Sequence, residues 1–413
     1  MIPRFKPAIG PAELGAILRP GPAADATGAF EREFASAFGA REGVAFNSGR
    51  GALFALLNAL EITGAEIVIP AYTCSVVAYA VSVSGNRPVF VDAEATGYNM
   101  DLDQLESAIT PQTAMVIPTH VFGFPADVDR VSEIVRRAEQ RYGRKIWILQ
   151  DCAHAFGATW RGRRVSEAGD AALFGLGISK MMTSIFGGML TTNDPALAAR
   201  VREWRSTNSP SPTVGASLEH RAYLAAVATA FSAPVYGAVR WLQDETTLLD
   251  GMTKAYHMDG QIRLPADATH QMPPVDAAVG RMQLVRYPQF EERRRRHARV
   301  YREQLSLPAG WRMPVDDEGA TYSHFPIHVP DRERTIRDFL AAGIQLGRLI
   351  EYSVPHLAEY GGASPSRYPN SWSHSEHTIN LPVHPDLSDR DQARIVERIN
   401  ELSPVAMAAS AAH

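Results

Sequence analysis

Short apolar runs that alternate with helical stretches constrain the fold of this chain more than any other feature. The runs lie at residues 43–46, 66–70, 87–92, 114–118, 146–151, 171–176 and 188–192. Most are apolar on both faces, as expected for strands that helices cover on both sides. Helical stretches separate several of them, at 51–60, 75–84, 102–109 and 128–142. The pattern predicts an α/β fold with a doubly wound, mostly parallel sheet of seven strands.

The chain is long enough for more than one domain. Its 413 residues exceed the size at which a single hydrophobic core keeps growing. We expect a large domain at 1–205, an atypical apolar and loop-rich insertion at 206–270, and a linking helix with a smaller α+β domain at 271–413. Within the last part, the pattern predicts helices at 274–304, 333–342 and 388–402 and strands at 323–329 and 377–381.

The insertion has the weakest structural signal. A helix is predicted at 195–205, and a Ser/Pro/Thr-rich loop follows at 206–215. Residues 224–242 are strongly apolar but include Pro234 and Arg240, so the stretch is too short and too interrupted to predict a membrane span. We interpret it as a buried helix pair or a dimer contact, with a membrane-surface role as the alternative.

Composition narrows the classes of function. The formal net charge of −4 offers no basic footprint for nucleic acid. The two cysteines, Cys74 and Cys152, cannot form a disulfide framework and suit a reducing compartment. Residues 1–20 contain no continuous apolar signal region. We therefore expect a cytoplasmic protein without a nucleic-acid partner, a membrane contact or a metal site.

Lysine is rare in this chain, which makes its positions informative. Of 41 Lys and Arg residues only four are lysine, and Lys180 alone among them lies in an apolar segment, 174–186, that carries no other charge. Burying an ammonium group is costly unless it has a role. A lysine amine can be desolvated and made nucleophilic, whereas a guanidinium stays protonated. Lys180 is therefore a candidate nucleophile, with a surface-directed strand-end lysine as the alternative.

Two further sequence features accompany Lys180. The segment 47–52 (Asn-Ser-Gly-Arg-Gly-Ala) follows a predicted strand and opens a helix, so its backbone amides, with Gly49 and Arg50, are suited to bind phosphate. Asp151 ends the strand at 146–151, at the edge where doubly wound sheets bind ligands. The alternative for 47–52 is a tight strand–helix turn, and the alternative for Asp151 is a carboxylate that caps the following turn.

The three features together are far more specific than any one of them. A strand-end carboxylate can keep a pyridine nitrogen protonated, and an amine in the same cleft can form a Schiff base. The order of phosphate loop, Asp151 and Lys180 predicts an enzyme that uses pyridoxal 5'-phosphate (PLP). His120 and His154 also follow strand ends on this edge. Either could contact the cofactor or the substrate, although both could equally be structural.

Several segments then resemble those of a known family, the nucleotide-sugar aminotransferases of the DegT/StrS type. The most specific are IPAYT at 69–73, PVFVD at 88–92, IPTHVFG at 117–123, DCAH at 151–154, Ser179-Lys180, GGMLTTND at 187–194 and LPVH at 381–384. The resemblance extends over nearly the whole chain. It implies the fold-type I architecture of aspartate aminotransferase and a homodimer.

The resemblance also implies roles for individual residues. Lys180 would carry PLP as an internal aldimine, Asp151 would partner the pyridine nitrogen, and His154 would lie beside the ring. Around the cofactor it further places the residues Gly49, Arg50, Ser179, Tyr72 and Cys74. The implied reaction transfers an amino group from glutamate, through pyridoxamine 5'-phosphate, to a keto-sugar linked to a nucleotide.

The chain also departs from the family pattern. Arg50 and Gly175 stand where threonine and serine are common, and Cys74 stands where an aromatic often stacks on the ring. The segment 270–273 replaces the family's Asn-Tyr-Arg-Met, which reaches the partner subunit. These changes leave two alternatives open: another fold-type I reaction (lyase, decarboxylase or oxidase) on a non-sugar substrate, and a PLP-fold protein with a binding or regulatory role.

Overall fold

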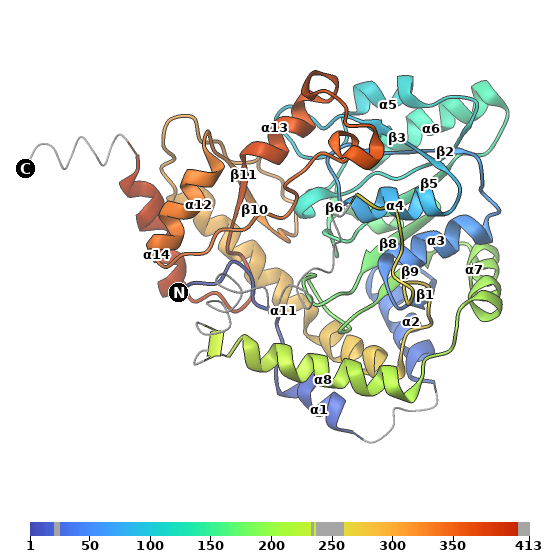
Figure 1. The fold of residues 1–413 in the computed structure, drawn as a ribbon, viewed down its shortest axis with the longest axis horizontal. Coiled ribbons are helices and arrows are strands. Elements are labelled where there is room, and N and C mark those ends of the chain that lie inside the picture. Colours follow the sequence, from blue (N-terminus) through green and yellow to red (C-terminus); the bar gives the residue numbers. More distant parts are fainter. Residues whose placement is uncertain (20–24, 233–234, 237–259, 404–413) are drawn as a thin grey trace, which may run out of the picture.

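A seven-stranded sheet forms the centre of the molecule (Figure 1). The structure, a computed structural model, describes residues 1–19, 25–232, 235–236 and 260–403. The strands follow the order β1-β9-β8-β5-β4-β2-β3. Their bounds are Glu42–Phe46 (β1), Glu66–Pro70 (β2), Arg87–Val91 (β3), Thr113–Val116 (β4), Trp147–Asp151 (β5), Ala171–Gly175 (β8) and Gly188–Thr192 (β9). Only β9 runs against its neighbours in this sheet. All seven predicted strands are thus confirmed.

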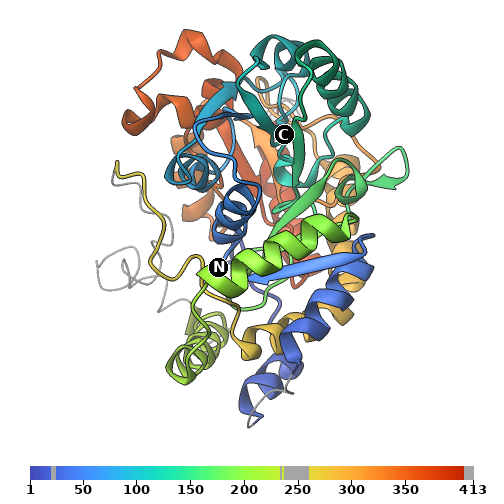
Figure 2. The same ribbon diagram turned by 90° about the vertical axis from the view of Figure 1, so that its right-hand side faces the viewer.

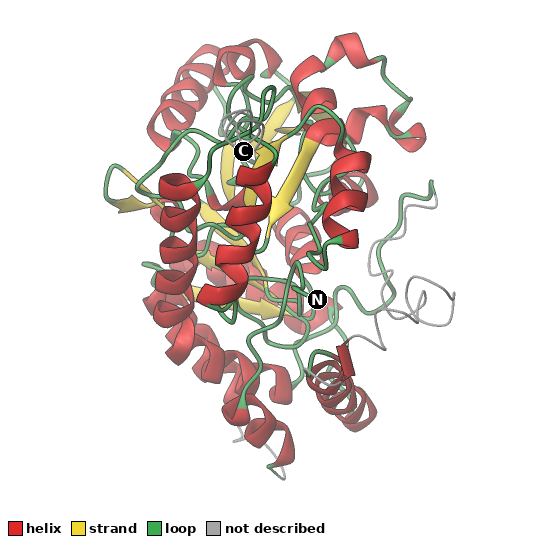
Figure 3. Ribbon diagram, turned by 90° about the vertical axis from the view of Figure 1, so that its left-hand side faces the viewer, coloured by secondary structure: helices red, strands yellow, loops and turns green. Residues whose placement is uncertain are grey.

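Helices cover both faces of the sheet (Figures 2 and 3). Successive strand residues enter different cores because side chains alternate across a strand. Val44 and Leu173 pack in one core, while Ala45 and Phe174 pack in another. The first face carries Gly49–Ala59 (α3), Ser75–Val83 (α4) and Pro195–Asn208 (α7), and the second carries Ala26–Ala37 (α2), Leu102–Ala108 (α5) and Val128–Tyr142 (α6). This layering confirms the predicted α/β architecture.

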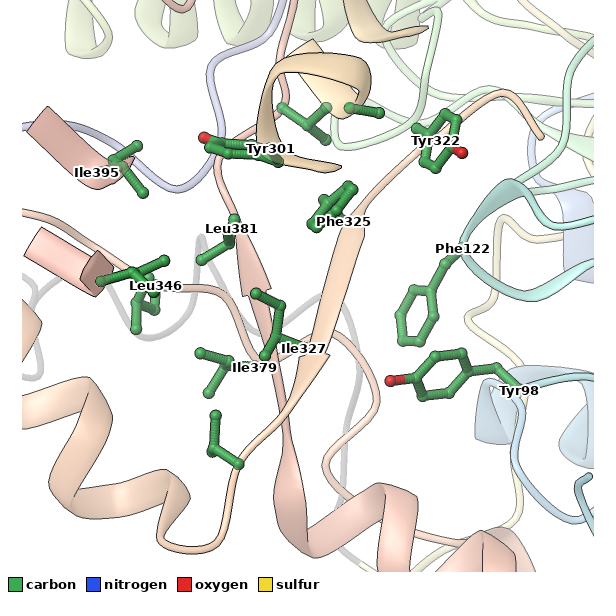
Figure 4. Close-up of a cluster of buried hydrophobic side chains, with 14 of the residues drawn as sticks. Tyr98, Phe122, Tyr301, Tyr322, Phe325, Ile327, Leu346, Ile379, Leu381 and Ile395 are labelled. Atoms are coloured by element: carbon green, nitrogen blue, oxygen red, sulfur yellow. The ribbon is translucent and has the colours of Figure 1, made fainter. Parts of the chain in front are cut away.

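A smaller unit follows the long helix Pro274–Gln304 (α11). Its strands pair antiparallel, and its core contains Tyr301, Phe325 and Ile379 (Figure 4). Tyr98 and Phe122 from the large sheet's loops join the same core, so the two parts share side chains. Its elements are Phe325–His328 (β10), Arg332–Ala341 (α12), Pro369–His377 (α13), Thr378–Leu381 (β11) and Asp389–Glu401 (α14). The division at 205 and 270 stays a prediction.

The structure corrects the sequence pattern in three places. Helices Pro11–Leu18 (α1), α2 and α13 were not predicted, and neither was the small hairpin Thr159–Trp160 (β6) with Arg163–Arg164 (β7). The predicted loop at 206–215 is shorter, because α7 continues to Asn208 and Val214–Ala230 (α8) begins where the Thr213 hydroxyl accepts the Ala216 N–H. The apolar stretch 224–242 begins inside α8, and its residues 233–234 and 237–242 lie outside the described residues. In the described part of the chain, no helix has the length and apolarity that crossing a bilayer requires.

Candidate active site

The carboxyl ends of β5 and β8 bring Asp151 and Lys180 to one edge of the sheet. These strands are parallel neighbours, with Asp151 opposite Leu173. Lys180 follows the end of β8, and its side chain folds back over that strand: a Cβ built on Gly175 would lie 3.2 Å from Lys180 Cε and 3.7 Å from Ala153 Cβ. The charge of Lys180 also acts on Asp151. The two predicted residues therefore converge where doubly wound sheets bind ligands.

Asp151 is a buried carboxylate with few donors. It is 3% exposed and accepts the Ala153 N–H at 3.0 Å and the Thr119 hydroxyl at 3.2 Å. Burial raises the pKa of Asp151, while the Ala153 N–H, the Lys180 charge and the Thr119 hydroxyl oppose that rise. An ionised carboxylate in such a place is stabilised by a cation or a charged N–H donor. A protonated pyridine nitrogen is such a donor.

Two imidazole rings lie beside Lys180. The rings of His154 and His324 have centroids 5.9 Å apart. Burial and the Lys180 charge lower the pKa of His154 well below its usual value, and burial, Arg294 and Lys180 do the same for His324. Both rings are therefore neutral at physiological pH. The buried Nδ1 of His154 has no hydrogen-bond partner among the residues that the structure describes, which leaves it for a ligand.

Sequence analysis missed His324. It begins the run of residues that leads into β10, on the small unit, and no spacing in the sequence connects it to Asp151 or Lys180. Its Nδ1 lies 3.1 Å from the Ser323 hydroxyl. Only the packing of the small unit against the sheet brings His324 to the site.

The start of α3 lies at the same sheet edge. Ser48 caps the helix by accepting the Gly51 N–H at 3.0 Å, and its hydroxyl donates to the Ala268 carbonyl at 2.9 Å. A Cβ on Gly49 would lie 3.4 Å from Gly175 Cα, and one on Gly188 would lie 2.4 Å from Gly49 N. The amides at this helix start are thus packed against the end of β8, in a position suited to a phosphate group.

Arg50 points into a pocket next to this helix start. The pocket has a volume of about 270 Å³, and its walls include Arg50, Arg263, Ser75 and Tyr79. Both guanidinium groups lie near a helix N-terminus, where anionic groups are favoured. Arg263 was not predicted, because it lies more than two hundred residues from Arg50 in the sequence.

Residues 270–273, which stand where the resembled family has a segment that reaches the partner subunit, contact other parts of their own chain. The His270 carbonyl accepts the Asn47 N–H at 3.0 Å, and the Gln271 side chain donates to the Ser209 carbonyl at 3.1 Å. His270 therefore contacts the start of the segment 47–52, and Gln271 contacts the residue after α7, both within their own chain.

The remaining predicted residues lie in different environments. Ser179 is exposed beside Lys180, and Cys74 is half-buried at the start of α4, with its Sγ 3.8 Å from the Tyr352 hydroxyl. Tyr72 is fully buried, and its hydroxyl donates to the Ile350 carbonyl at 3.2 Å. Its ring packs against Tyr98 in the core that joins the two parts. This placement favours a structural role for Tyr72 over the predicted cofactor contact.

His120 is also part of the core. It is fully buried, its Nδ1 accepts the Ala126 N–H at 2.9 Å, and its Nε2 lies 3.0 Å from Gln150 Oε1. Both ring nitrogens are used by the protein itself. The predicted contact of His120 with cofactor or substrate is therefore not supported, and the structural alternative is favoured.

Comparison with known proteins gives one consistent result. The DegT/DnrJ/EryC1/StrS aminotransferase family matches residues 14–227 and 248–400. The spore coat polysaccharide biosynthesis protein SpsC of Bacillus subtilis is 26% identical over 393 residues, which cover 90% of this chain and 88% of SpsC. The dTDP-3-amino-3,6-dideoxy-alpha-D-galactopyranose transaminase of Aneurinibacillus thermoaerophilus is 27% identical over 376 residues, with 90% and 88% covered.

Solved structures share the fold. The sugar aminotransferase CalS13 from Micromonospora echinospora superimposes with a TM-score of 0.74 at 23% identity, over 97% of this chain and 100% of CalS13. The aminotransferase TlmJ from Streptoalloteichus hindustanus gives 0.74 at 25% identity, over 97% and 98%. The chain therefore belongs to the DegT/DnrJ/EryC1/StrS aminotransferase family, whose members depend on PLP, as its sequence motifs predicted.

Proposed function

We propose that this aminotransferase moves an amino group from an amino acid, glutamate, to a keto-sugar linked to a nucleotide. One observation carries the proposal: Lys180 and Asp151 converge at the carboxyl ends of the neighbouring strands β5 and β8. The sugar nucleotide is supported by the relatives, among them enzymes named as dTDP-sugar and UDP-sugar aminotransferases.

The residues at this edge fit PLP. Asp151 would hold the pyridine nitrogen, since it is a buried carboxylate that needs a positive partner. The buried, unpartnered Nδ1 of His154 would contact the ring oxygen. The start of α3, with Gly49 and Arg50, would hold the phosphate. Ser179 and Cys74 would line the site beside Lys180 and α4. When bound, PLP supplies an electron sink that stabilises negative charge on the substrate carbon.

Lys180 would do the proton chemistry. Its amine would hold the cofactor, and Lys180 Nζ, once free, would accept the proton from the α-carbon of the amino donor and later release it. Neutral His154 and His324 leave Lys180 without a competing base of high pKa. The apolar side chains of Met181 and Met182, both buried, exclude water behind Lys180.

We also propose a cytoplasmic homodimer. The large apolar side chains of Leu18, Val214 and Leu218 are 80%, 79% and 60% exposed on α1 and α8, which supports contact with a second copy. Both cysteines carry free thiols, which supports a reducing compartment.

A half-reaction tests the proposed function. The PLP-loaded protein is mixed with L-glutamate, and the visible absorption band of the bound cofactor's conjugated ring is followed. We expect the band to disappear and 2-oxoglutarate to form in equal amount. Release of carbon dioxide instead would favour a lyase or decarboxylase, and no change with any amino acid would favour a binding role. Either result would contradict the proposal.

A further inference from the structure

A buried pair connects helix α8 to the start of α11. His220 on α8 is 7% exposed, and its Nδ1 lies 2.8 Å and 3.0 Å from the two carboxylate oxygens of Asp276, which is fully buried. Sequence analysis gave neither residue a role. A buried ionisable pair is costly to form and does not by itself indicate stability, so its surroundings decide what it does.

The pair contacts the loop that carries Lys180. The backbone N–H of Phe186, six residues after Lys180 in sequence, points at Asp276 Oδ2 at 3.4 Å. The Phe186 ring packs against His220, with centroids 4.7 Å apart, and against Tyr223, with centroids 4.8 Å apart. The Asp276 carboxylate therefore contacts both His220 of α8 and the loop that carries Lys180.

The loop needs such support, because its backbone is strained. Ile185 has a φ of 74° and is fully buried. A β-branched residue in this region is strained and persists only where its surroundings hold it. Ile185 packs with Leu224 of α8 and with Val275 and Val279 of α11. The helices that hold the strained residue are thus the two that His220 and Asp276 join.

A second contact fixes the same loop to α11. The Thr183 N–H donates to Gln283 Oε1 at 3.3 Å, and Gln283 in turn donates to Glu13 Oε1 of α1 at 2.8 Å. The loop's own contact near the lysine is a turn, in which the Lys180 N–H donates to the Gly177 carbonyl at 3.0 Å. The Lys180 loop is therefore joined to α11 and, through Gln283, to α1, in addition to its own hydrogen bonds with Leu176 at the end of β8.

The remainder of α8 extends away from the site. Arg221 donates to the Ile17 and Arg19 carbonyls at the end of α1. Beyond the helix, Phe231 packs against Phe5, and the Tyr236 hydroxyl donates to Gln345 Oε1 of the small unit at 2.8 Å. Helices α1, α8 and α11 pack against one another (Figure 1). Helix α8 and the residues after it, up to Tyr236, thus contact both the Lys180 loop and the small unit.

Electrostatics favour a charged pair. Burial lowers the pKa of His220, but Asp276 outweighs burial, with Glu219 and Asp267 adding to it, so the net pKa is raised. Burial raises the pKa of Asp276 to about 6, against the hydrogen bond and charge of His220 and the Phe186 N–H. Removing either partner leaves the other buried without compensation.

We infer that His220 and Asp276 are positioning residues that hold the loop of Lys180 in its active place. The inference rests on the proposed role of Lys180 only for its catalytic consequence, since the contacts themselves involve no cofactor.

Hydrogen–deuterium exchange on the cofactor-free protein tests the contact directly. Asp276→Leu removes both acceptors at similar size, and we expect the amides of 183–187 to exchange about tenfold faster or more, as local opening becomes easier. Asp276→Asn keeps one acceptor oxygen and should restore most of the protection. Leu224→Ala keeps the pair and removes packing against Ile185, so it measures how much faster exchange lost packing alone produces. Unchanged exchange of 183–187 in Asp276→Leu would overturn the inference.

His220→Phe provides a second variant should Asp276→Leu fold poorly. It keeps the ring contact with Phe186 and removes the nitrogen that binds Asp276. We expect faster exchange at 183–187. In the PLP-loaded enzyme, we expect kcat to fall about tenfold or more, on the order of the loss for a misplaced catalytic group, because Lys180 is misplaced. The KM for glutamate should change less than about threefold, because the substrate contacts are kept. Wild-type exchange and kcat in this variant would overturn the inference.

The two proposals fail in different ways. If the exchange effects occur but wild-type Lys180 takes no cofactor, the proposed function fails and the positioning contact stands. If Lys180 takes cofactor and both His220→Phe and Asp276→Leu behave as wild type, the positioning role fails and the proposed function stands.

Discussion

The imidazole of His120 shows how a polar residue at a site edge can belong to the core. Its Nδ1 accepts the Ala126 N–H, so the ring proton must lie on Nε2, which donates to Gln150 Oε1. A second proton would have to enter at Nδ1, facing an N–H group. Burial, opposed by the Gln150 contact, lowers the pKa of His120 to about 4. The ring is therefore held neutral by its two fixed partners.

This gives a pH dependence of stability. The pKa of His120 is about 4 in the folded protein and about 6.5 in the unfolded chain, so the unfolded chain binds the extra proton first as the pH falls. Stability due to His120 is full above pH 6.5 and is lost towards pH 4, by about 2 kcal/mol between pH 7 and pH 5. In urea unfolding, the free energy of unfolding of wild type should fall by about 2 kcal/mol more than that of His120→Gln between pH 7 and pH 5. An equal loss in both proteins would show that His120 does not titrate as described.

Gly175 tests the position of the Lys180 side chain at the same scale. A Cβ there would lie 3.2 Å from Lys180 Cε, whereas a Cβ on Gly177 would have nothing within 4 Å. We expect Gly175→Ala to push the lysine aside and weaken PLP binding about fivefold, corresponding to about 1 kcal/mol of overpacking. Gly177→Ala should bind PLP as wild type does. Equal affinities for the two variants, measured by absorbance titration, would contradict this geometry.

At the scale of elements, the start of α3 depends on a segment from far along the chain. A Cβ on Gly51 would lie 1.7 Å from the Ala268 carbonyl oxygen, a backbone atom that cannot move alone. This approach lets Ser48 donate to the same carbonyl while capping α3. Gly51 thus serves the packing of α3 against the segment 267–270. Gly49 and Arg50 are the residues that we propose to bind phosphate.

A pair of helix glycines checks this point. Gly51→Ala should destabilise the protein by about 2–3 kcal/mol and weaken PLP binding, because 267–270 must move away from α3. Gly15→Ala in α1 meets nothing within 4 Å and should leave stability unchanged or raise it by up to about 1 kcal/mol. Both are measured by urea unfolding with and without PLP. A stable Gly51→Ala protein with normal PLP affinity would disprove the close approach.

The same elements show what a sequence can predict. Strand ends are local signals, so Asp151 and Lys180 could be found from apolar runs and the turns after them. Contacts between distant segments leave no such signal. Packing of segments as much as about 210 residues apart brings His324, Arg263 and the His220–Asp276 pair to the site. The short helix α1 has too little periodicity to stand out in the sequence.

At the scale of the whole molecule, the two parts meet through one core rather than a linker. Tyr98 and Phe122 from the sheet's loops pack with Tyr322 and Phe325, the neighbours of His324 in sequence. The buried Arg294 of α11 donates to the Ser323 carbonyl at 3.0 Å and so fixes the chain just before His324. The docking of the small unit thus adds His324 to the site. The residues that we propose to bind the cofactor follow the strands of the large sheet.

The proposed aminotransferase chemistry depends on Lys180 as the residue that holds the cofactor. The most direct measurement is reduction of the PLP-loaded protein with borohydride, followed by mass spectrometry of its peptides. We expect the label on Lys180, its loss in Lys180→Ala, and its retention in Lys145→Arg, which changes a lysine paired with Asp170 on the surface. A label on another lysine, or an unlabelled wild-type protein, would contradict the account.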